Sequence, residues 1–199
     1  MERLKPYYVR ESEHENAIKL YKINLRLSEA FYTSLSVFEI TLRNAIHNSC
    51  KVYFGDNFWF INHLPVELAT KVIEIKNKIV ASHKAPTADR IVSELTFGFW
   101  TSLFNRKYAY LLWKPLYQIF IHAPHILLQR AIISPKLNSI RDFRNRVYHY
   151  EPICWNLNAL QQKHNLIIEL LYWLDSGAVQ WIADIDRAPG LLREILENE

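Results

Sequence analysis

Residues 27–56 read LSEAFYTSLSVFEITLRNAIHNSCKVYFGD, and their spacing indicates the fold class. Side chains that share one face of a helix recur there at steps of three and four residues, namely Phe31, Leu35, Phe38, Leu42, Ala45, Ile46 and Ser49. The pattern predicts a long helix from about Leu27 to Phe54. We expect Gly55 and Asp56 to close it, because glycine accepts the left-handed conformation that ends many helices.

Helical spacing continues on both sides of this segment. Ser12 and Glu15 have the spacing of a capping box, which predicts that a first helix of about 12 residues opens there. Pro65 suits the first turn of a helix that runs to about His83, with Leu68, Val72, Ile75 and Ile79 on one stripe. After a predicted loop over 84–87, the spacing predicts a helix from Thr87 to Phe104 with Gly98 inside it. Residues 105–134 are predicted to form short helices, with breaks at Pro115 and Pro124. The remaining predicted elements are a helix from Pro135 to about Tyr150, a helix from Asn158 to Asp175, and two short helices around Pro189 and Gly190. No β-hairpin signal is present, so the sequence predicts an all-α protein of one domain, residues 1–199.

The composition excludes several classes of protein. The four glycines, at positions 55, 98, 177 and 190, lie too far apart to form a phosphate-binding loop. Cys50 and Cys154 are too few for a disulfide framework or a Cys-rich zinc site, and we expect both to be buried. Pro124 separates His122 from His125 and spoils a helical metal pair, so we expect no metal and no cofactor. No apolar run reaches the ~20 residues of a membrane span, and no signal-peptide core is present. We expect a cytoplasmic protein without a membrane partner.

Positive charge is concentrated in the middle of the chain. The net charge is only +4, but residues 95–141 contain six basic side chains and no acidic one. Tyr108, Tyr110, Trp113 and Tyr117 lie among these basic residues and are candidates to stack on nucleic-acid bases, whereas Phe97, Phe99 and Trp100 have the spacing of core residues. A polyanion such as RNA would bind such a segment. The alternative is a solvated surface with uneven charge.

The segment with most chemical character is SIRDFRNRVYHYEPI, residues 139–153. On a helix, Arg141, Asn145 and His149 are four residues apart and share one face, which Arg144 flanks. We expect His149 in the last turn, where the negative end of the helix dipole favours the imidazolium form. Guanidinium groups beside a titratable imidazole suit a phosphodiester, because arginine binds phosphate charge and histidine moves a proton. The alternative is a helix end with a charged, solvated face.

The string from Arg144 to His149, RNRVYH, resembles the R-x4-6-H motif of the HEPN superfamily. Its extension through Glu151, Pro152 and Ile153 resembles the Abi-like (abortive infection) branch. Two further stretches are similar to that branch and follow the same order, FEITLRNAI at 38–46 and LTFGFW at 95–100. The resemblance covers about residues 30–155, which leaves 156–199 as C-terminal helices packed on this core.

The resemblance implies a HEPN-like helical bundle that forms a homodimer, or a larger even oligomer, with two Arg/His motifs facing each other in a cleft. Proteins of this kind are antiphage factors or toxins that cleave RNA without a metal and leave 2′,3′-cyclic phosphate ends. His149 would be the general acid or base, Arg144 would stabilise the phosphorane, and Asn145 would orient the histidine or the phosphate. An RNA or protein antitoxin is a partner that the resemblance implies. Some members are silenced by nucleotidylation of a tyrosine two residues after the histidine. In this chain Glu151 stands at that position, so this form of control is not expected.

Further residues are expected to support these three or to position RNA: Arg141, Arg146, Tyr148, Tyr150, Glu39, Arg43, Asn44 and His47. Glu39, Arg43 and His47 form a second row at four-residue steps on a helix that is otherwise apolar. Either they form an internal polar network, with each other or with the motif helix, or Arg43 and Asn44 lie at the edge of the cleft. Two function classes remain open, a metal-independent endoribonuclease and a non-catalytic HEPN-like module that binds RNA or protein.

Overall fold

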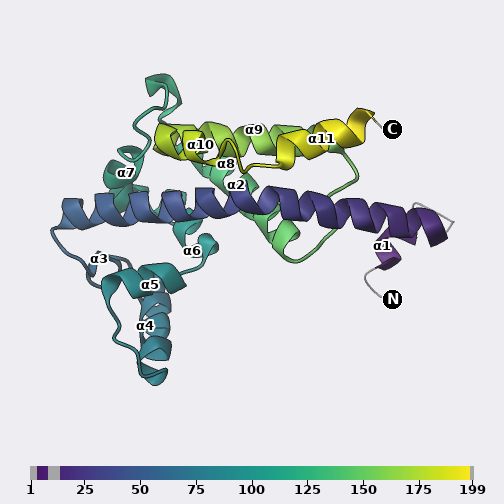
Figure 1. The fold of residues 1–199 in the computed structure, drawn as a ribbon. Coiled ribbons are helices and arrows are strands. Elements are labelled where there is room, and N and C mark those ends of the chain that lie inside the picture. Colours follow the sequence, from purple (N-terminus) through teal and green to yellow (C-terminus); the bar gives the residue numbers. More distant parts are fainter. Residues whose placement is uncertain (1–3, 9–13, 198–199) are drawn as a thin grey trace. The chain divides into compact units, whose positions relative to one another are not determined.

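The structure, a computed structural model, describes residues 4–8 and 14–197 (Figure 1). The described residues form eleven α-helices and no strand, which confirms the all-α prediction. Their bounds are α1 Lys5–Tyr8, α2 His14–Phe54, α3 Trp59–Asn62, α4 Val66–Ala81, α5 Ala88–Glu94, α6 Phe97–Ser102, α7 Ala109–Tyr117, α8 Arg130–Tyr148, α9 Leu157–Leu174, α10 Ser176–Ile182 and α11 Ala188–Glu197. Two 3-10 helices, η2 Arg106–Tyr108 and η3 His125–Leu127, complete the described secondary structure.

Helix α2 corrects the predicted N-terminal half. A separate first helix before Leu27 was wrong, because α2 runs without interruption over 41 residues. Residues 14–54 contain neither proline nor glycine, so nothing in the backbone forces a break. Ser12, the predicted cap, lies outside the described residues. The predicted end at Gly55 is confirmed, since that residue has a φ of 66° and the Asp56 amide donates to the Lys51 carbonyl at 3.2 Å.

Three further boundaries differ from the prediction. The helix expected over 87–104 is two helices, because Thr96 is extended and its hydroxyl caps a new start by accepting from the Phe99 amide at 3.2 Å. Pro115 does not break α7 but lies within it, and its carbonyl accepts a hydrogen bond from the Ser49 hydroxyl at 2.7 Å. Helix α8 begins at Arg130, with Pro135 inside it, and ends at Tyr148.

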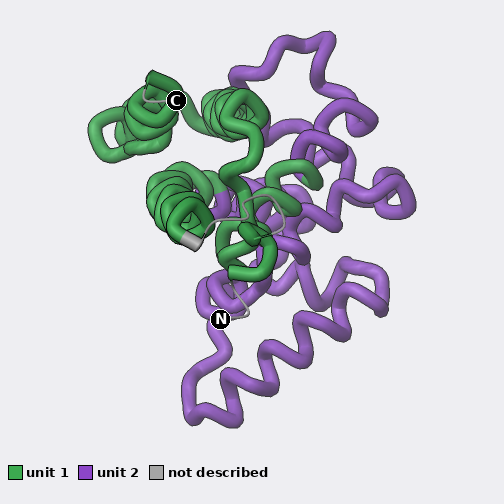
Figure 2. Tube along the Cα trace, turned by 90° about the vertical axis from the view of Figure 1, so that its right-hand side faces the viewer, with its two compact units in different colours: residues 1–38, 138–199 green, residues 39–137 purple. Residues whose placement is uncertain are grey.

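The chain divides into two compact units, residues 1–38 with 138–199 and residues 39–137 (Figure 2). In the first unit α10 and α11 pack on α9. The core of this unit joins α2 to α8 through an edge-to-face pair, Phe31 and Phe143, whose ring centroids are 4.9 Å apart. This unit also contains a buried polar pair. His164 Nε2 lies 2.6 Å from Asp186 Oδ2, and both side chains are less than a tenth exposed.

The second unit has an aromatic core in which His47 takes part. His47 is 6% exposed, and its Nδ1 accepts a hydrogen bond from the Trp59 indole at 3.2 Å. The Phe60 ring packs beside it, with centroids 5.8 Å apart. Burial lowers the pKa of His47, because a charged imidazolium is poorly solvated there. His47 is therefore held as a neutral core residue.

His47 should make the protein less stable in mild acid. Because its pKa is lower in the folded state than the ordinary 6.5, the unfolded chain binds the proton first as the pH falls. The stabilisation is complete above pH 6.5 and decreases as the pH falls from there toward the folded-state pKa. In urea unfolding at several pH values, the free energy of unfolding should fall more steeply with decreasing pH in the parent than in His47→Gln. Parallel curves for the two proteins would contradict the assignment.

Candidate functional site

The end of α8 presents the predicted motif on an amphipathic helix. Its apolar side chains, Ile140, Phe143 and Val147, are buried, as the spacing predicts. Of the three predicted catalytic residues, Asn145 and His149 are exposed and Arg144 is half-buried. His149 is the first residue after the helix, and its amide donates to the Asn145 carbonyl at 2.9 Å. The motif therefore lies at the accessible C-terminal end of this helix.

An aromatic stack holds Arg144. Its guanidinium carbon lies 4.0 Å from the centroid of the Tyr148 ring, one helical turn further along. Tyr148 also stacks on Tyr32 of α2, with centroids 5.3 Å apart and planes only 21° from parallel. A cation over a tyrosine face is stabilised by the ring quadrupole, and stacking limits the rotamers that a long side chain can adopt. Tyr148 thus positions a cation.

Tyr150 has a strained backbone. Its φ is 56°, in the left-handed region where glycine is usual, and it ends α8 in a Schellman motif. The two hydrogen bonds of that motif are present, from the Tyr150 amide to the Val147 carbonyl at 3.2 Å and from the Glu151 amide to the Arg146 carbonyl at 2.9 Å. The turn directs the chain away from the helix immediately after His149.

Replacing Tyr150 should measure this strain. Tyr150→Gly and Tyr150→Ala remove the same ring, but only alanine keeps the Cβ that the left-handed conformation disfavours. We expect the glycine variant to be more stable than the alanine variant by about 1 kcal/mol in urea unfolding. Equal stabilities would mean that the residue leaves the left-handed region in solution.

Arg146 and Asn24 hold the segment that follows the motif. Arg146 donates from Nη2 to the Pro152 carbonyl, and its Nε lies 3.6 Å from the Glu151 carboxylate. Asn24 is fully buried, and its Oδ1 accepts from the amides of Ile153 at 2.6 Å and Cys154 at 3.3 Å. Its Nδ2 donates to the Glu151 carbonyl at 3.2 Å. These contacts give Arg146 a structural role. They also give Asn24, which the motif did not indicate, a role in holding the segment after His149.

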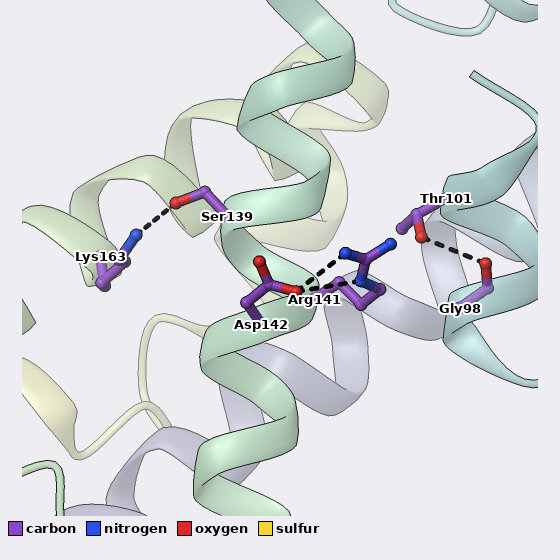
Figure 3. A network of polar contacts seen from close by, with 6 residues as sticks. All are labelled: Gly98, Thr101, Ser139, Arg141, Asp142 and Lys163. Carbon is purple, nitrogen blue, oxygen red and sulfur yellow. Dashed lines mark hydrogen bonds and ion pairs between the residues drawn. The ribbon is translucent and has the colours of Figure 1, made fainter. Parts of the chain in front are cut away.

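Arg141 is also engaged within its own helix. Its Nε and Nη2 lie 3.1 and 2.9 Å from one carboxylate oxygen of Asp142, as Figure 3 shows. On the opposite side of α8, Lys163 of α9 donates to the Ser139 hydroxyl (Figure 3). The side chain of Arg141 is about one third exposed, so an anion can still reach it. The ion pair reduces the charge that it offers.

A pocket of about 540 Å³ lies beside the motif in the first unit. We call it the tyrosine pocket; its lining residues are Leu25, Ser28, Glu29, Tyr32, Thr33, Val147, Tyr148, Tyr150, Ile185 and Arg187. Two members of its wall, Tyr148 and Tyr150, immediately flank His149 in the sequence. Glu29 and Arg187 form an ion pair at 3.5 Å, with both side chains more than 70% exposed. The pocket thus combines aromatic walls with a charged rim.

Ser28 is a polar group without a partner in this pocket. The residue is 6% exposed, and its hydroxyl has no hydrogen-bond partner among the residues that the structure describes. A buried hydroxyl left unsatisfied costs free energy, and Ser28 is one of the residues that line the pocket. Sequence reasoning missed both Ser28 and Tyr32. Neither belongs to a motif, and more than 100 residues of chain separate them from His149.

The other predicted supporting residues belong to the second unit. Arg43 lies 3.5 Å from the Ser93 carbonyl through Nη1, and its Nε is buried without a hydrogen-bond partner in the described part of the chain. Asn44 is exposed and Glu39 is half-buried. His47 belongs to the aromatic core described above, which favours the structural interpretation of this row at that position. The supporting roles of Glu39, Arg43 and Asn44 stay predictions.

The aromatic candidates of the basic middle separate into two groups. Tyr108 was wrongly proposed for stacking, because it is 4% exposed and its hydroxyl donates to the Glu67 carboxylate, to which Lys107 also donates at 2.7 Å. Phe97, Phe99 and Trp100 are buried, as predicted, and so are Cys50 and Cys154. Tyr110 is 85% exposed and Tyr117 lies at the surface, so these two keep a face for a ligand.

Neither a metal site nor a membrane span is found among the described residues. No cluster of His, Cys, Asp and Glu that could hold a metal ion occurs in residues 4–8 and 14–197. Over the same described ranges, no helix has the length and apolar character that crossing a membrane requires.

Comparison of the chain with models of protein families, with curated proteins and with solved structures finds no match. The functional assignment therefore depends on the geometry and on the motif.

Proposed function

We propose that this protein is a metal-independent endoribonuclease of the antiphage or toxin type, with Arg144, Asn145 and His149 as its catalytic residues. One observation carries the proposal: a guanidinium fixed by stacking on Tyr148 lies on the same helix end as an exposed imidazole. A cation held over a tyrosine ring stabilises developing phosphorane charge with little reorganisation. The motif that resembles the HEPN superfamily coincides with these residues.

The division of labour follows from the chemistry of each group. His149 would take the proton from the 2′-hydroxyl or give one to the leaving 5′-oxygen. Arg144 would bind the non-bridging phosphate oxygens, and Asn145 would orient the phosphate or the imidazole. Attack by the 2′-oxygen on phosphorus breaks the bond to the 5′-oxygen and leaves a 2′,3′-cyclic phosphate. No step needs a cofactor or a redox partner.

A cleavage assay tests this function. Purified protein in EDTA should cut single-stranded RNA and leave DNA of the same sequence intact, because DNA lacks the attacking 2′-hydroxyl. RNA that is bound but never cut, by protein freed of any inhibitor, would favour the alternative of a binding module. Cleavage that EDTA abolishes would instead point to a metal-dependent nuclease.

Arg144 should affect rate and binding differently in its two variants. Arg144→Ala should lower the cleavage rate about 10²-fold and weaken binding of a 2′-O-methyl RNA, since a charge-assisted phosphate contact is lost. Arg144→Lys should restore binding more than rate, because an ammonium keeps the charge but loses the planar fork. Equal rates for the lysine variant and the parent would show that the fork is not used.

We also propose that the active form is a homodimer or a larger even oligomer. One Arg144 and one His149 offer few groups to a phosphate, whereas a two-fold arrangement doubles the groups around it. Light scattering should give at least twice the 23.6 kDa of one chain at tens of micromolar. A fully active monomer would contradict this part of the proposal.

A further inference from the structure

The walls of the tyrosine pocket suit a planar ligand. Tyr32 is 56% exposed although one of its faces stacks on Tyr148, so the remainder of its ring is open to solvent. Leu25, Val147 and Ile185 supply apolar contacts around it. An aromatic ring stacks well against such a wall, and every nucleobase offers one.

The rim and floor of the pocket suit the polar edge of that ligand. Glu29 presents acceptors and Arg187 presents donors side by side, which matches the mixed donors and acceptors on the edge of a base. Ser28 adds a buried hydroxyl without a partner among the described residues, which an apolar side chain of another protein would leave unsatisfied. An apolar protein partner therefore fits the pocket less well than a base does.

We infer that the tyrosine pocket holds a nucleobase of a single-stranded RNA, stacked on Tyr32 with its polar edge at Glu29 and Arg187. The inference rests on the proposed function, because it makes this base a neighbour of the phosphate at Arg144 and His149. The shared residue is Tyr148, which contacts both the guanidinium of Arg144 and the ring of Tyr32. The pocket would thus set which nucleotide is placed at the scissile bond.

Stacking is tested by binding, without cleavage. The probes are 2′-O-methyl adenosine trinucleotide and the same molecule with an abasic central residue. The parent should bind the first about tenfold more tightly, as expected for one base stacked on an aromatic ring. Tyr32→Leu should remove that difference and Tyr32→Phe should retain it. Tyr172→Leu, which replaces a half-exposed tyrosine of the same unit outside the pocket, is the matched control and should behave as the parent.

Edge recognition is tested with two pyrimidines. Cytosine carries an exocyclic amino group that Glu29 can accept from, whereas uracil carries none. The 2′-O-methyl cytidine trinucleotide should therefore bind about fivefold more tightly than the uridine one, a difference of the size of the net contribution of one typical hydrogen bond. Glu29→Gln should reduce the ratio of cytidine to uridine affinity. It should not change the loss of affinity that the abasic residue causes.

The outcomes separate this inference from the proposed function. Equal affinities for the intact and abasic probes, or a difference that survives in Tyr32→Leu, would overturn the pocket assignment even if RNA is cleaved. A Tyr32-dependent difference in a protein that never cleaves RNA would support the pocket and transfer it to a binding module. Failure of all probes to bind would overturn the pocket assignment.

Discussion

His149→Ala should lower the rate of RNA cleavage by about 10²–10⁴-fold, the usual contribution of a positioned acid or base. The side chain is exposed and follows the last helical residue, so its removal leaves no cavity and no buried partner. The unfolding midpoint and the affinity for a 2′-O-methyl RNA should therefore stay close to those of the parent. Initial rates, binding and thermal melts on the same preparations give the three quantities.

His125→Ala is the matched control. It removes an exposed histidine from η3, in the basic middle of the chain, and should cleave as fast as the parent. If His149→Ala also cleaves at the parental rate, the active site is not at the end of α8. If both variants lose activity alike, the loss reflects charge and not a specific proton transfer.

Asp186→Ala should lower the free energy of unfolding by about 2–4 kcal/mol, because the buried His164 imidazole and the Ala188 amide both lose their hydrogen-bond acceptor. His164 Nε2 lies 2.6 Å from Asp186 Oδ2, and their side chains are 8% and 6% exposed. The other carboxylate oxygen accepts from the Ala188 amide at 3.2 Å, which caps the start of α11. Urea unfolding of the parent and the variant at pH 7 gives the difference directly.

The same pair positions part of the tyrosine pocket. Ile185 and Arg187 line the pocket and flank Asp186 in the chain. Loss of the Asp186 carboxylate should therefore also weaken binding of the 2′-O-methyl probes. Asp184→Ala removes an exposed carboxylate two residues away and should leave both stability and binding close to parental. A loss below 1 kcal/mol in Asp186→Ala would mean that water reaches the pair.

The accuracy of the predicted fold depended on which signals compete locally. The helix end at Gly55 and the helix start near Asn158 were predicted well, because Gly55 ends α2 in the left-handed conformation and Asn156 caps α9. The division between α5 and α6 was missed, since the apolar spacing continues through Leu95 while Thr96 caps a second start. Pro135 was taken for a helix start although α8 begins five residues earlier. A proline shows where an amide is absent, but tertiary contacts decide whether the helix continues.

The candidate site could be predicted only where its residues are consecutive in the chain. The string from Arg144 to His149 indicates its own helix face, and burial of Val147 agrees with it. Asn24 carried a weak signal, as a polar side chain on the stripe that includes Leu27 and Phe31. Tyr32 carried none, because its stack on Tyr148 exists only after α2 and α8 pack. Contacts between segments this far apart arise from tertiary structure and leave no local pattern.

The most direct test of the central claim is the chemistry of the cleaved ends. An RNA cut by the parent in EDTA should carry a 2′,3′-cyclic phosphate on the 5′ fragment and a free 5′-hydroxyl on the other. A single 2′-deoxy substitution on the 5′ side of the mapped bond should abolish cleavage there and nowhere else, because it removes the nucleophile. Mass spectrometry of the fragments gives both results. A 5′-phosphate end, or undiminished cleavage at the deoxy position, would contradict the role proposed for His149 and Arg144.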